Sequence, residues 1–334
     1  MMSTVFEHDL LAGAYNLLVN CGEAKAGDKV LVVHEDPALG WYDLAAPQSV
    51  ATVATQIGAL AELIKVGDPI NGMPSNVAAA IDASDVTVYF ARLGDHGRFG
   101  ASRERGVSVV SYARTASALG SDYGTRPHVE MTAIKTLIDD LLYNADEITV
   151  TCPLGTSLRG APLRHVEDGP ADVSIRRFPL CVPAPISAAK FEGQVALNGY
   201  LAPTGNRTYQ PASQIIDGIV KAEISGGRIQ QFRGEQAAIS AIQDHYAHVA
   251  GLFDLDAEIV DSWHAGIHAG CSFDQPEEAD PDLWANTWFG SPHYMHIHTC
   301  GAPTPGEICW MIENPTITAD GKPIWENGSL SIGQ

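Results

Sequence analysis

The sequence predicts an α/β protein with an N-terminal open α/β (Rossmann-like) domain and a second, β-rich α+β domain. Helical and buried-strand patterns alternate up to about residue 145, as they do in open sheets of parallel strands. From residue 147 onward, short strand patterns separated by Gly and Pro turns prevail. Five of the twelve histidines lie in two short segments near the C-terminal end. We therefore predict two domains, residues 1–145 and residues 146–334.

The first elements follow from hydrophobic periodicity. Apolar residues at helical spacing predict a helix over residues 4–21, and the apolar run Lys29–His34 predicts a buried parallel strand. Residues 46–64 are predicted as a helix that begins at Pro47. The sequence leaves open whether a further strand lies at residues 61–66.

The same alternation continues through the rest of the first domain. A helix ending at Ala78–Ala83 precedes a second buried strand, Asp85–Phe90, and Val107–Tyr112 is predicted as a third. Pro127 introduces a long helix over His128–Asn144, because proline is favoured where helices begin. No G-x-G-x-x-G motif follows the first strand, so the sequence does not support a dinucleotide site.

The second domain is predicted to consist mostly of short strands. Gly226-Gly227 is typical of a hairpin turn, and one helix, Glu235–Ala250, interrupts the strands. The predicted strands are Ile148–Cys152, Gln194–Leu201, Gly218–Ile224, Gly227–Arg233, Ile259–Asp261 and Tyr294–His298. The histidine segments therefore belong to the β-rich part of the chain.

The composition restricts the partners and the compartment. The net charge is −20 with only 20 Lys and Arg, a surface that repels phosphate backbones and anionic lipid. We therefore expect neither nucleic acid nor a membrane as a partner. The six cysteines are scattered, the N-terminus lacks a signal-peptide pattern, and no apolar run is long enough to span a membrane. We expect a cytoplasmic protein with reduced thiols.

The two histidine segments carry the strongest functional signal. His296 and His298 are two residues apart, so on a strand both imidazoles lie on one face and Ile297 lies on the other. His264 or His268, from the second, glycine-flanked segment, can complete a site of three nitrogens. Because neutral imidazole is a common ligand for Zn and Fe(II), we predict a metal site here.

Three further residues are candidates for supporting roles. His96 lies in a loop after a predicted strand, where sites of α/β sheets form, and it is the candidate general base. His293 precedes the strand of the histidine pair and could hydrogen-bond a substrate. Glu307 could accept a hydrogen bond from a ligand histidine, or it could be a surface carboxylate at the start of a strand. A solvated loop histidine is the alternative for His293.

The order of short motifs resembles that of the aminopeptidase T family. Residues 27–33 resemble its Gly-Glu-x-Val-Leu-Ile opening, and residues 148–158 resemble its strand followed by Gly-Thr-Asp-Leu. Residues 220–229 resemble its hairpin before a helix. The superfamily also contains 2,5-dihydroxypyridine 5,6-dioxygenase, a mononuclear Fe(II) ring-cleaving enzyme, to which the motif pattern of this chain is most similar.

The resemblance implies roles for individual histidines. Members of the superfamily end with a histidine, a Gly-rich turn and a later His-x-Asp. His264 matches the first histidine and is favoured over His268, while His296 and His298 match the second motif with histidine in place of aspartate. The dioxygenase also has a histidine shortly after an N-domain strand, and His96 sits in about that place. The implied metal ligands are therefore His264, His296 and His298.

These matches lead to one expected function and two alternatives. The aminopeptidases hold two metals partly through carboxylates, for which this chain offers no convincing match. We expect a mononuclear non-haem Fe(II) dioxygenase that cleaves a hydroxylated, N-heterocyclic aromatic ring with O₂. The first alternative is an aminopeptidase or an amide or ring hydrolase using Zn or Mn, since Zn²⁺ lowers the pKa of bound water to about 7. The second is a protein whose histidines are only structural. The relatives' assembly implies a homo-oligomer.

Overall fold

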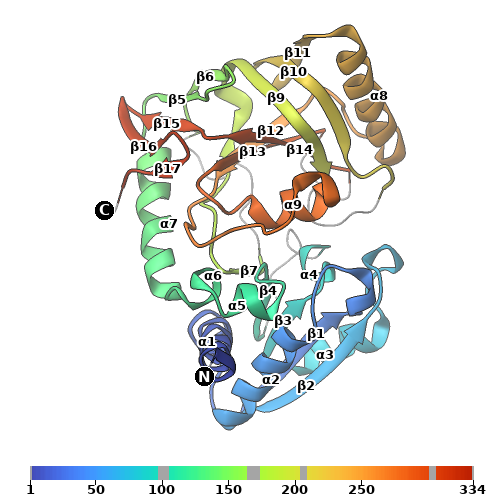
Figure 1. Ribbon diagram of the computed structural model, residues 1–334, viewed down its shortest axis with the longest axis vertical. Helices are drawn as coiled ribbons and strands as arrows, with labels where there is room; N and C mark the ends of the chain where they lie inside the picture. Colours follow the sequence, from blue (N-terminus) through green and yellow to red (C-terminus); the bar gives the residue numbers. More distant parts are fainter. Residues whose placement is uncertain (1, 97–104, 164–173, 204–208, 301–305, 333–334) are drawn as a thin grey trace. The chain divides into compact units, whose positions relative to one another are not determined.

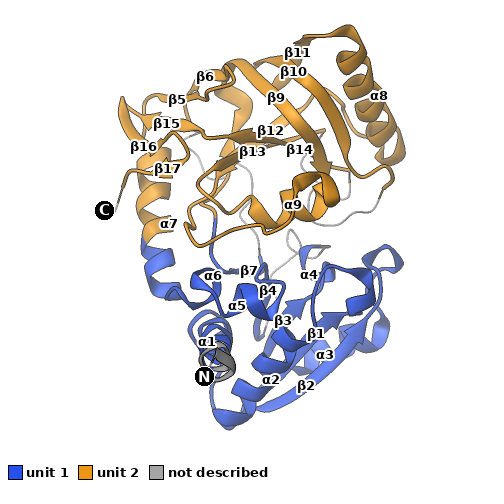
Figure 2. Ribbon diagram, viewed as in Figure 1, with its two compact units in different colours: residues 1–133, 173–181 blue, residues 134–172, 182–334 orange. Residues whose placement is uncertain are grey.

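The computed structural model describes residues 2–96, 105–163, 174–203, 209–300 and 306–332. The chain forms two compact units (Figure 2): unit 1 is residues 1–133 and 173–181, and unit 2 is residues 134–172 and 182–334. The observed boundary, between residues 133 and 134, lies inside a helix and earlier than the predicted boundary at residue 145. A short later strand also returns to the sheet of unit 1, where its backbone completes one edge.

Unit 1 is built on a five-stranded parallel sheet with the order β2-β1-β3-β4-β7 (Figure 1). Its strands are β1 (Lys29–Glu35), β2 (Leu60–Val66), β3 (Val86–Phe90), β4 (Val107–Ser111) and β7 (Arg176–Phe178). The three predicted strands β1, β3 and β4 are confirmed. They lie inside the sheet, which is why their sequences are nearly continuous apolar runs.

The predicted helix over residues 46–64 is too long. It ends at Gln56, and Gly58 turns the chain with a φ of 80° before β2 begins. As the edge strand of the sheet, β2 leaves Leu60 65% exposed and Leu63 38% exposed. An edge strand lacks the buried apolar run of a central one, so its sequence could not be told from a helix.

The other predicted helices of unit 1 are confirmed. The predicted helix over residues 4–21 is α1 continued by a π-helical turn, Asn16–Cys21. The helices are α1 (Met2–Tyr15), α2 (Ala45–Gln56), α3 (Ser75–Ala83), α4 (Leu93–His96), α5 (Ala116–Leu119), α6 (Asp122–Thr125) and the first part of α7 (His128–Tyr143). The short helices α4, α5 and α6 were not predicted. The prediction of a loop at His96 is wrong, because His96 ends the short helix α4. Short 3-10 turns lie at Pro37–Leu39 and Pro69–Asn71. The long helix predicted after Pro127 is thus confirmed as α7.

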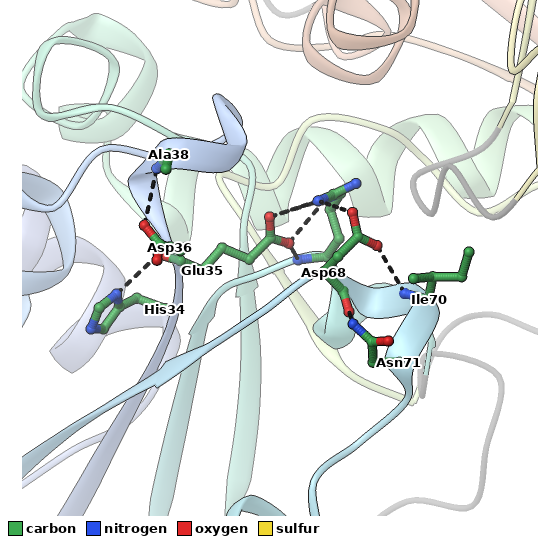
Figure 3. A network of polar contacts seen from close by, with 8 residues as sticks. His34, Glu35, Asp36, Ala38, Asp68, Ile70 and Asn71 are labelled. Atoms are coloured by element: carbon green, nitrogen blue, oxygen red, sulfur yellow. Dashed lines mark hydrogen bonds and ion pairs between the residues drawn. The ribbon is translucent and has the colours of Figure 1, made fainter.

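A buried ion pair ties together the carboxyl ends of β1 and β3 (Figure 3). Nε of Arg92 donates to both carboxylate oxygens of Glu35, at 3.0 and 3.1 Å. The backbone N–H of Arg92 donates to the same carboxylate at 2.6 Å. Asp68 lies 3.6 Å from the guanidinium, and the Trp41 ring lies 4.7 Å away. Since both side chains of the pair are buried, each charge depends on the other.

Unit 2 contains a sheet of 12 strands in which β10 and β11 branch from β9. The strands are β5 (Ile148–Thr151), β6 (Ser157–Gly160), β8 (Ile186–Ser187), β9 (Glu192–Pro203), β10 (Gln214–Ser225), β11 (Arg228–Arg233), β12 (Val260–Ala265), β13 (Tyr294–Thr299), β14 (Ile308–Glu313), β15 (Thr316–Ala319), β16 (Lys322–Glu326) and β17 (Ser329–Leu330). Gly226 and Gly227 have φ angles of 61° and 71° and join β10 to β11, so the predicted hairpin turn is confirmed.

Helices cover parts of this sheet. The predicted helix after the hairpin is confirmed as α8 (Gln236–Phe253), which packs on β10, and α9 (Pro281–Trp288) packs on β9. Short 3-10 turns lie at Ala188–Lys190 and Glu277–Ala279. The last strands, β15 to β17, were not predicted.

The inner face of α8 carries a buried histidine, His245, which is 4% exposed. Neither of its ring nitrogens has a hydrogen-bond partner among the described residues, and the Tyr209 ring lies 6.1 Å away. Burial, and then the proximity of His248, lower the pKa of His245 from 6.5 to about 4. The imidazole is therefore neutral in the folded protein at neutral pH.

The buried pair of unit 1 yields a stability prediction. Arg92→Met leaves the Glu35 carboxylate buried without its cation, so we expect the free energy of unfolding to fall by about 3–5 kcal/mol. The double variant Arg92→Met/Glu35→Met should recover most of that loss. Lys65→Met, which removes the exposed 3.0 Å pair with Asp36, is the control and should cost less than about 1 kcal/mol. Urea denaturation measures all three; equal losses for Arg92→Met and Lys65→Met would contradict the prediction.

The buried histidine of α8 yields a prediction about pH. The pKa of His245 is lower in the folded than in the unfolded protein. The contribution of the neutral imidazole to the free energy of unfolding is therefore complete above pH 6.5, and it disappears as the pH falls toward 4. The full change is about 3 kcal/mol. The free energy of unfolding of the wild type should therefore fall between pH 7 and pH 4. In His245→Leu it should fall less, and the difference between the two decreases should be about 3 kcal/mol. His8→Gln, which removes a histidine whose side chain is 85% exposed, serves as control. An unchanged pH dependence in His245→Leu would refute the prediction.

Candidate metal centre

Three adjacent antiparallel strands, β12, β13 and β14, carry the centre (Figure 1). His264 lies directly opposite His296 in the β12–β13 register, and Cys309 of β14 lies opposite His298. The three imidazoles therefore share one face of the sheet. The other face points into the core, where three large side chains are 0 to 1% exposed. These are Trp263, Ile297 and Trp310.

The first of these strands is longer than predicted. The sequence predicts a strand at Ile259–Asp261, but β12 runs over Val260–Ala265 and so includes His264. Its ladder is irregular between Val260 and Ser262, which disturbs the alternation that a sequence pattern would show.

The three histidines approach one another closely enough to share one ion. One ring nitrogen from each of His264, His296 and His298 lies within 4.8 Å of the others, and Nε2 of His264 is 3.1 Å from Nε2 of His298. Nitrogens bound at about 2.0–2.1 Å to one ion lie about 3–4 Å apart, so the spacing fits. His264 and His296 are buried, and the His298 side chain is 13% exposed. The group is therefore a possible three-histidine metal site.

A backbone carbonyl orients His264. Its Nδ1 lies 3.2 Å from the Pro183 oxygen, so Nδ1–H donates there and Nε2 keeps its lone pair for a metal. The segment around Pro183 is itself fixed by α7. Ala184 N–H donates to Asp139 at 2.8 Å, and the Tyr143 hydroxyl donates to the Pro185 oxygen at 2.7 Å.

A carboxylate orients His298. Nδ1 of His298 contacts Oε1 of Glu307, which is 3% exposed, and lies 3.5 Å from Sγ of Cys309. Burial opposes protonation of His298, but Glu307 and Cys309 outweigh it and raise the pKa of His298 from 6.5 to about 10. The contact makes Glu307 a buried partner of His298, so the alternative of a surface carboxylate is wrong.

Aromatic side chains border the third histidine. The Phe289 ring stands edge-on to His296 with the ring centroids 5.4 Å apart. Phe289 and Trp288 are partly buried and pack on a core cluster that includes Trp284 and Tyr294. No sequence pattern indicates these neighbours, because α9 comes close to β13 only through the fold.

Gly266 allows the loop after β12 to touch the loop before β13. Its N–H donates to the Tyr294 oxygen at 2.9 Å, and His268 N–H donates to the Gly290 oxygen at 2.9 Å. A Cβ at position 266 would lie 2.2 Å from the Ser291 oxygen, so only glycine fits.

The remaining histidines occupy other places. His268 is fully buried and its Nδ1 accepts the Gly270 N–H at 3.1 Å, so His264 rather than His268 joins the cluster. His293 is exposed, and its Nδ1 lies 3.0 Å from Oδ1 of Asn314. The side chain of His96, at the end of α4, lies outside the described residues. Catalytic roles for His96 and His293 stay predictions.

No protein-family model matches the chain, and no curated protein sequence matches it. Its fold is similar to that of 2,5-dihydroxypyridine dioxygenase from Pseudomonas putida KT2440, with a TM-score of 0.61, 13% identity and coverage of 97% of each chain. It is also similar to wild-type AmpT from Thermus thermophilus, with a TM-score of 0.55 and 14% identity over 98% of this chain and 100% of that one. The resemblance seen in the sequence is therefore confirmed at the level of the fold.

The comparisons and the cluster give two findings. The chain shares its fold along nearly its whole length with a dioxygenase and an aminopeptidase T, and it carries a possible three-histidine metal site. At 13% and 14% identity, the neighbours do not decide the reaction.

The cluster predicts how metal binding responds to mutation. His264→Ala, His296→Ala and His298→Ala should each weaken metal binding about tenfold or more, because each removes one nitrogen donor. His248→Ala, on the exposed side of α8, should not. Competition between the protein and a chelator for Zn²⁺ measures the affinity, with thermal unfolding as a check of the fold. Wild-type affinity in folded His296→Ala would eliminate this site.

Proposed function

We propose that this protein is a mononuclear non-haem Fe(II) dioxygenase that opens a hydroxylated, N-heterocyclic aromatic ring. The observation that carries the proposal is the composition of the cluster: among the described residues it consists of three imidazoles and no carboxylate. Neutral ligands leave the full +2 charge on a ferrous ion, which favours an anionic, bidentate substrate and leaves positions for O₂. The bound ion would supply Lewis-acid and redox chemistry to the ring.

The protein's own residues supply binding and orientation. His264, His296 and His298 would hold the ion, and Phe289, edge-on to His296 at 5.4 Å, offers an apolar aromatic neighbour for a flat ring. Aromatic rings attract one another edge-to-face or in offset stacks, worth about 0.5–1.5 kcal/mol beyond buried area. We propose that the same ring also packs against the aromatic substrate.

Proton removal from the ring hydroxyl is assigned to His96. A histidine with an ordinary pKa of about 6.5 can accept that proton at neutral pH and return it later. The backbone leading to His96 is well anchored, because Tyr112 donates to Asp95 at 3.0 Å and Arg92 is held by Glu35. His293 remains a second candidate for a hydrogen bond to substrate, although its Nδ1 is engaged with Asn314.

A metal-dependent hydrolase is the second candidate function. The fold similarity to AmpT favours it, since three imidazoles suit Zn²⁺ as well as Fe(II). A zinc ion in such a cluster lowers the pKa of its water to about 7 and creates a nucleophile. The absence of a carboxylate from the described cluster weighs against a peptidase with two metals.

The net charge and the cysteines indicate which partners and which location we propose for the enzyme. The net charge of −20 argues against nucleic acid and anionic membrane surfaces as partners. None of the six cysteines, all of which lie in the described part of the chain, forms a disulfide, in keeping with the cytoplasmic location that we propose. In the described part of the chain, no helix combines the length and apolar character needed to cross a bilayer. We further propose a homo-oligomer.

Oxygen consumption tests the proposed reaction. With Fe(II) and a panel of hydroxypyridines, hydroxyquinolines and catechols, an oxygen electrode should record O₂ uptake. The uptake should stop when air oxidises the bound iron, and it should return when ferrous ion and a reductant are added. His96→Ala should lower kcat by about 10²–10⁴ while the metal content stays unchanged, as for loss of a general base. Turnover in strictly anaerobic buffer with Zn²⁺ or Mn²⁺ would instead establish the hydrolase.

A further inference from the structure

One buried carboxylate stands immediately outside the three-histidine cluster. Glu307 is 3% exposed, and its Oε1 contacts Nδ1 of His298. The opposite nitrogen of the same ring, Nε2, lies 3.1 Å from Nε2 of His264. Glu307 thus holds the far side of an imidazole whose near side faces the proposed ion.

The position of this carboxylate is fixed by its surroundings. Glu307 directly precedes β14, whose Cys309 pairs with His298 in the ladder. Its backbone oxygen accepts a hydrogen bond from the buried Tyr209 hydroxyl at 3.0 Å. A side chain held at both its backbone and its carboxylate is well suited to orient a partner.

We propose that Glu307 is the positioning residue of the metal centre and supplies its negative charge. By accepting Nδ1–H from His298, it selects Nε2 as the nitrogen that faces the ion and makes the ring a stronger donor. This inference rests on the proposed role of the three histidines as ligands. It does not depend on which reaction the centre performs.

A comparison with Nδ1 of His264 explains why Glu307 matters. Nδ1 of His264 faces a neutral peptide oxygen, that of Pro183, at 3.2 Å. The three imidazoles carry no charge when they bind an ion, so Glu307 places a formal negative charge one hydrogen bond away. A hydrogen bond to a charged acceptor is roughly twice as strong as one between neutral groups. The His298 donor should therefore be the most basic of the described pair.

The nearby thiol cannot take over this role. Sγ of Cys309 lies 3.5 Å from the same Nδ1, and sulfur is a weak acceptor. Removal of the Glu307 carboxylate should consequently affect the ion even though Cys309 stays in place.

Two substitutions separate orientation from charge. Glu307→Gln keeps the length and an acceptor oxygen but loses the charge, whereas Glu307→Ala loses both. Glu313→Gln is the matched control, because Glu313 is an exposed glutamate at the other end of the same strand. The probe is Co²⁺, whose visible absorption reports the geometry of its ligands, and its affinity is measured by competition with a chelator.

We expect Glu307→Ala to weaken Co²⁺ binding about 10–100-fold and to change the spectrum, as loss of an orienting partner does. Glu307→Gln should show a smaller loss of affinity with a spectrum close to that of the wild type, and Glu313→Gln should show neither change. A purely structural role would lower the thermal stability of the metal-free protein without changing affinity or spectrum.

Wild-type affinity and spectrum in Glu307→Gln and Glu307→Ala would overturn the inference. If Glu307→Ala does not fold, Glu307→Gln decides by itself, with unchanged affinity as the refuting result. A wild-type protein that binds no Co²⁺ would overturn both this inference and the proposed metal centre. A protein that binds Co²⁺ as expected but consumes no O₂ when loaded with Fe(II) would remove the proposed reaction and leave the role of Glu307 intact.

Discussion

The antiparallel register of β12, β13 and β14 is the constraint on which the candidate centre depends. It sets His264 opposite His296 and Cys309 opposite His298, and it turns all three imidazoles to one face. A shift of one residue in any of these strands would exchange the two faces. Such a shift would carry Trp263 or Trp310 out of the core and bring polar rings into it. Burial of the aromatic residues therefore holds the centre in place.

The polar groups around the cluster are arranged unequally. His264 faces the neutral oxygen of Pro183, whereas His298 faces the buried carboxylate of Glu307. Both partners reach the centre from outside the histidine strands, so their positions depend on the packing of unit 2. Gly266 contributes by letting two loops meet backbone to backbone. The chemistry that we propose is thus a property of the whole unit.

The same architecture serves different reactions. A dioxygenase and an aminopeptidase T both share the fold over nearly the full chain, at 13% and 14% identity. Fold similarity therefore leaves function to the site, where residue types and their partners decide which metal and substrate can bind. In unit 1, the buried pair of Glu35 and Arg92 shows another use of charge, since it joins the ends of two parallel strands. The segment that leads to His96 begins at this point.

The sequence by itself determined the features that depend on local periodicity. The spacing of His296 and His298 placed both rings on one face, central strands showed as apolar runs, and paired glycines marked a hairpin. Only the tertiary structure decided that His264 rather than His268 joins the pair, and that Glu307 contacts His298. It also revealed the edge strand β2 and the return of β7 to unit 1. The reason is physical: periodicity is written along the chain, whereas contacts between distant residues depend on register and packing.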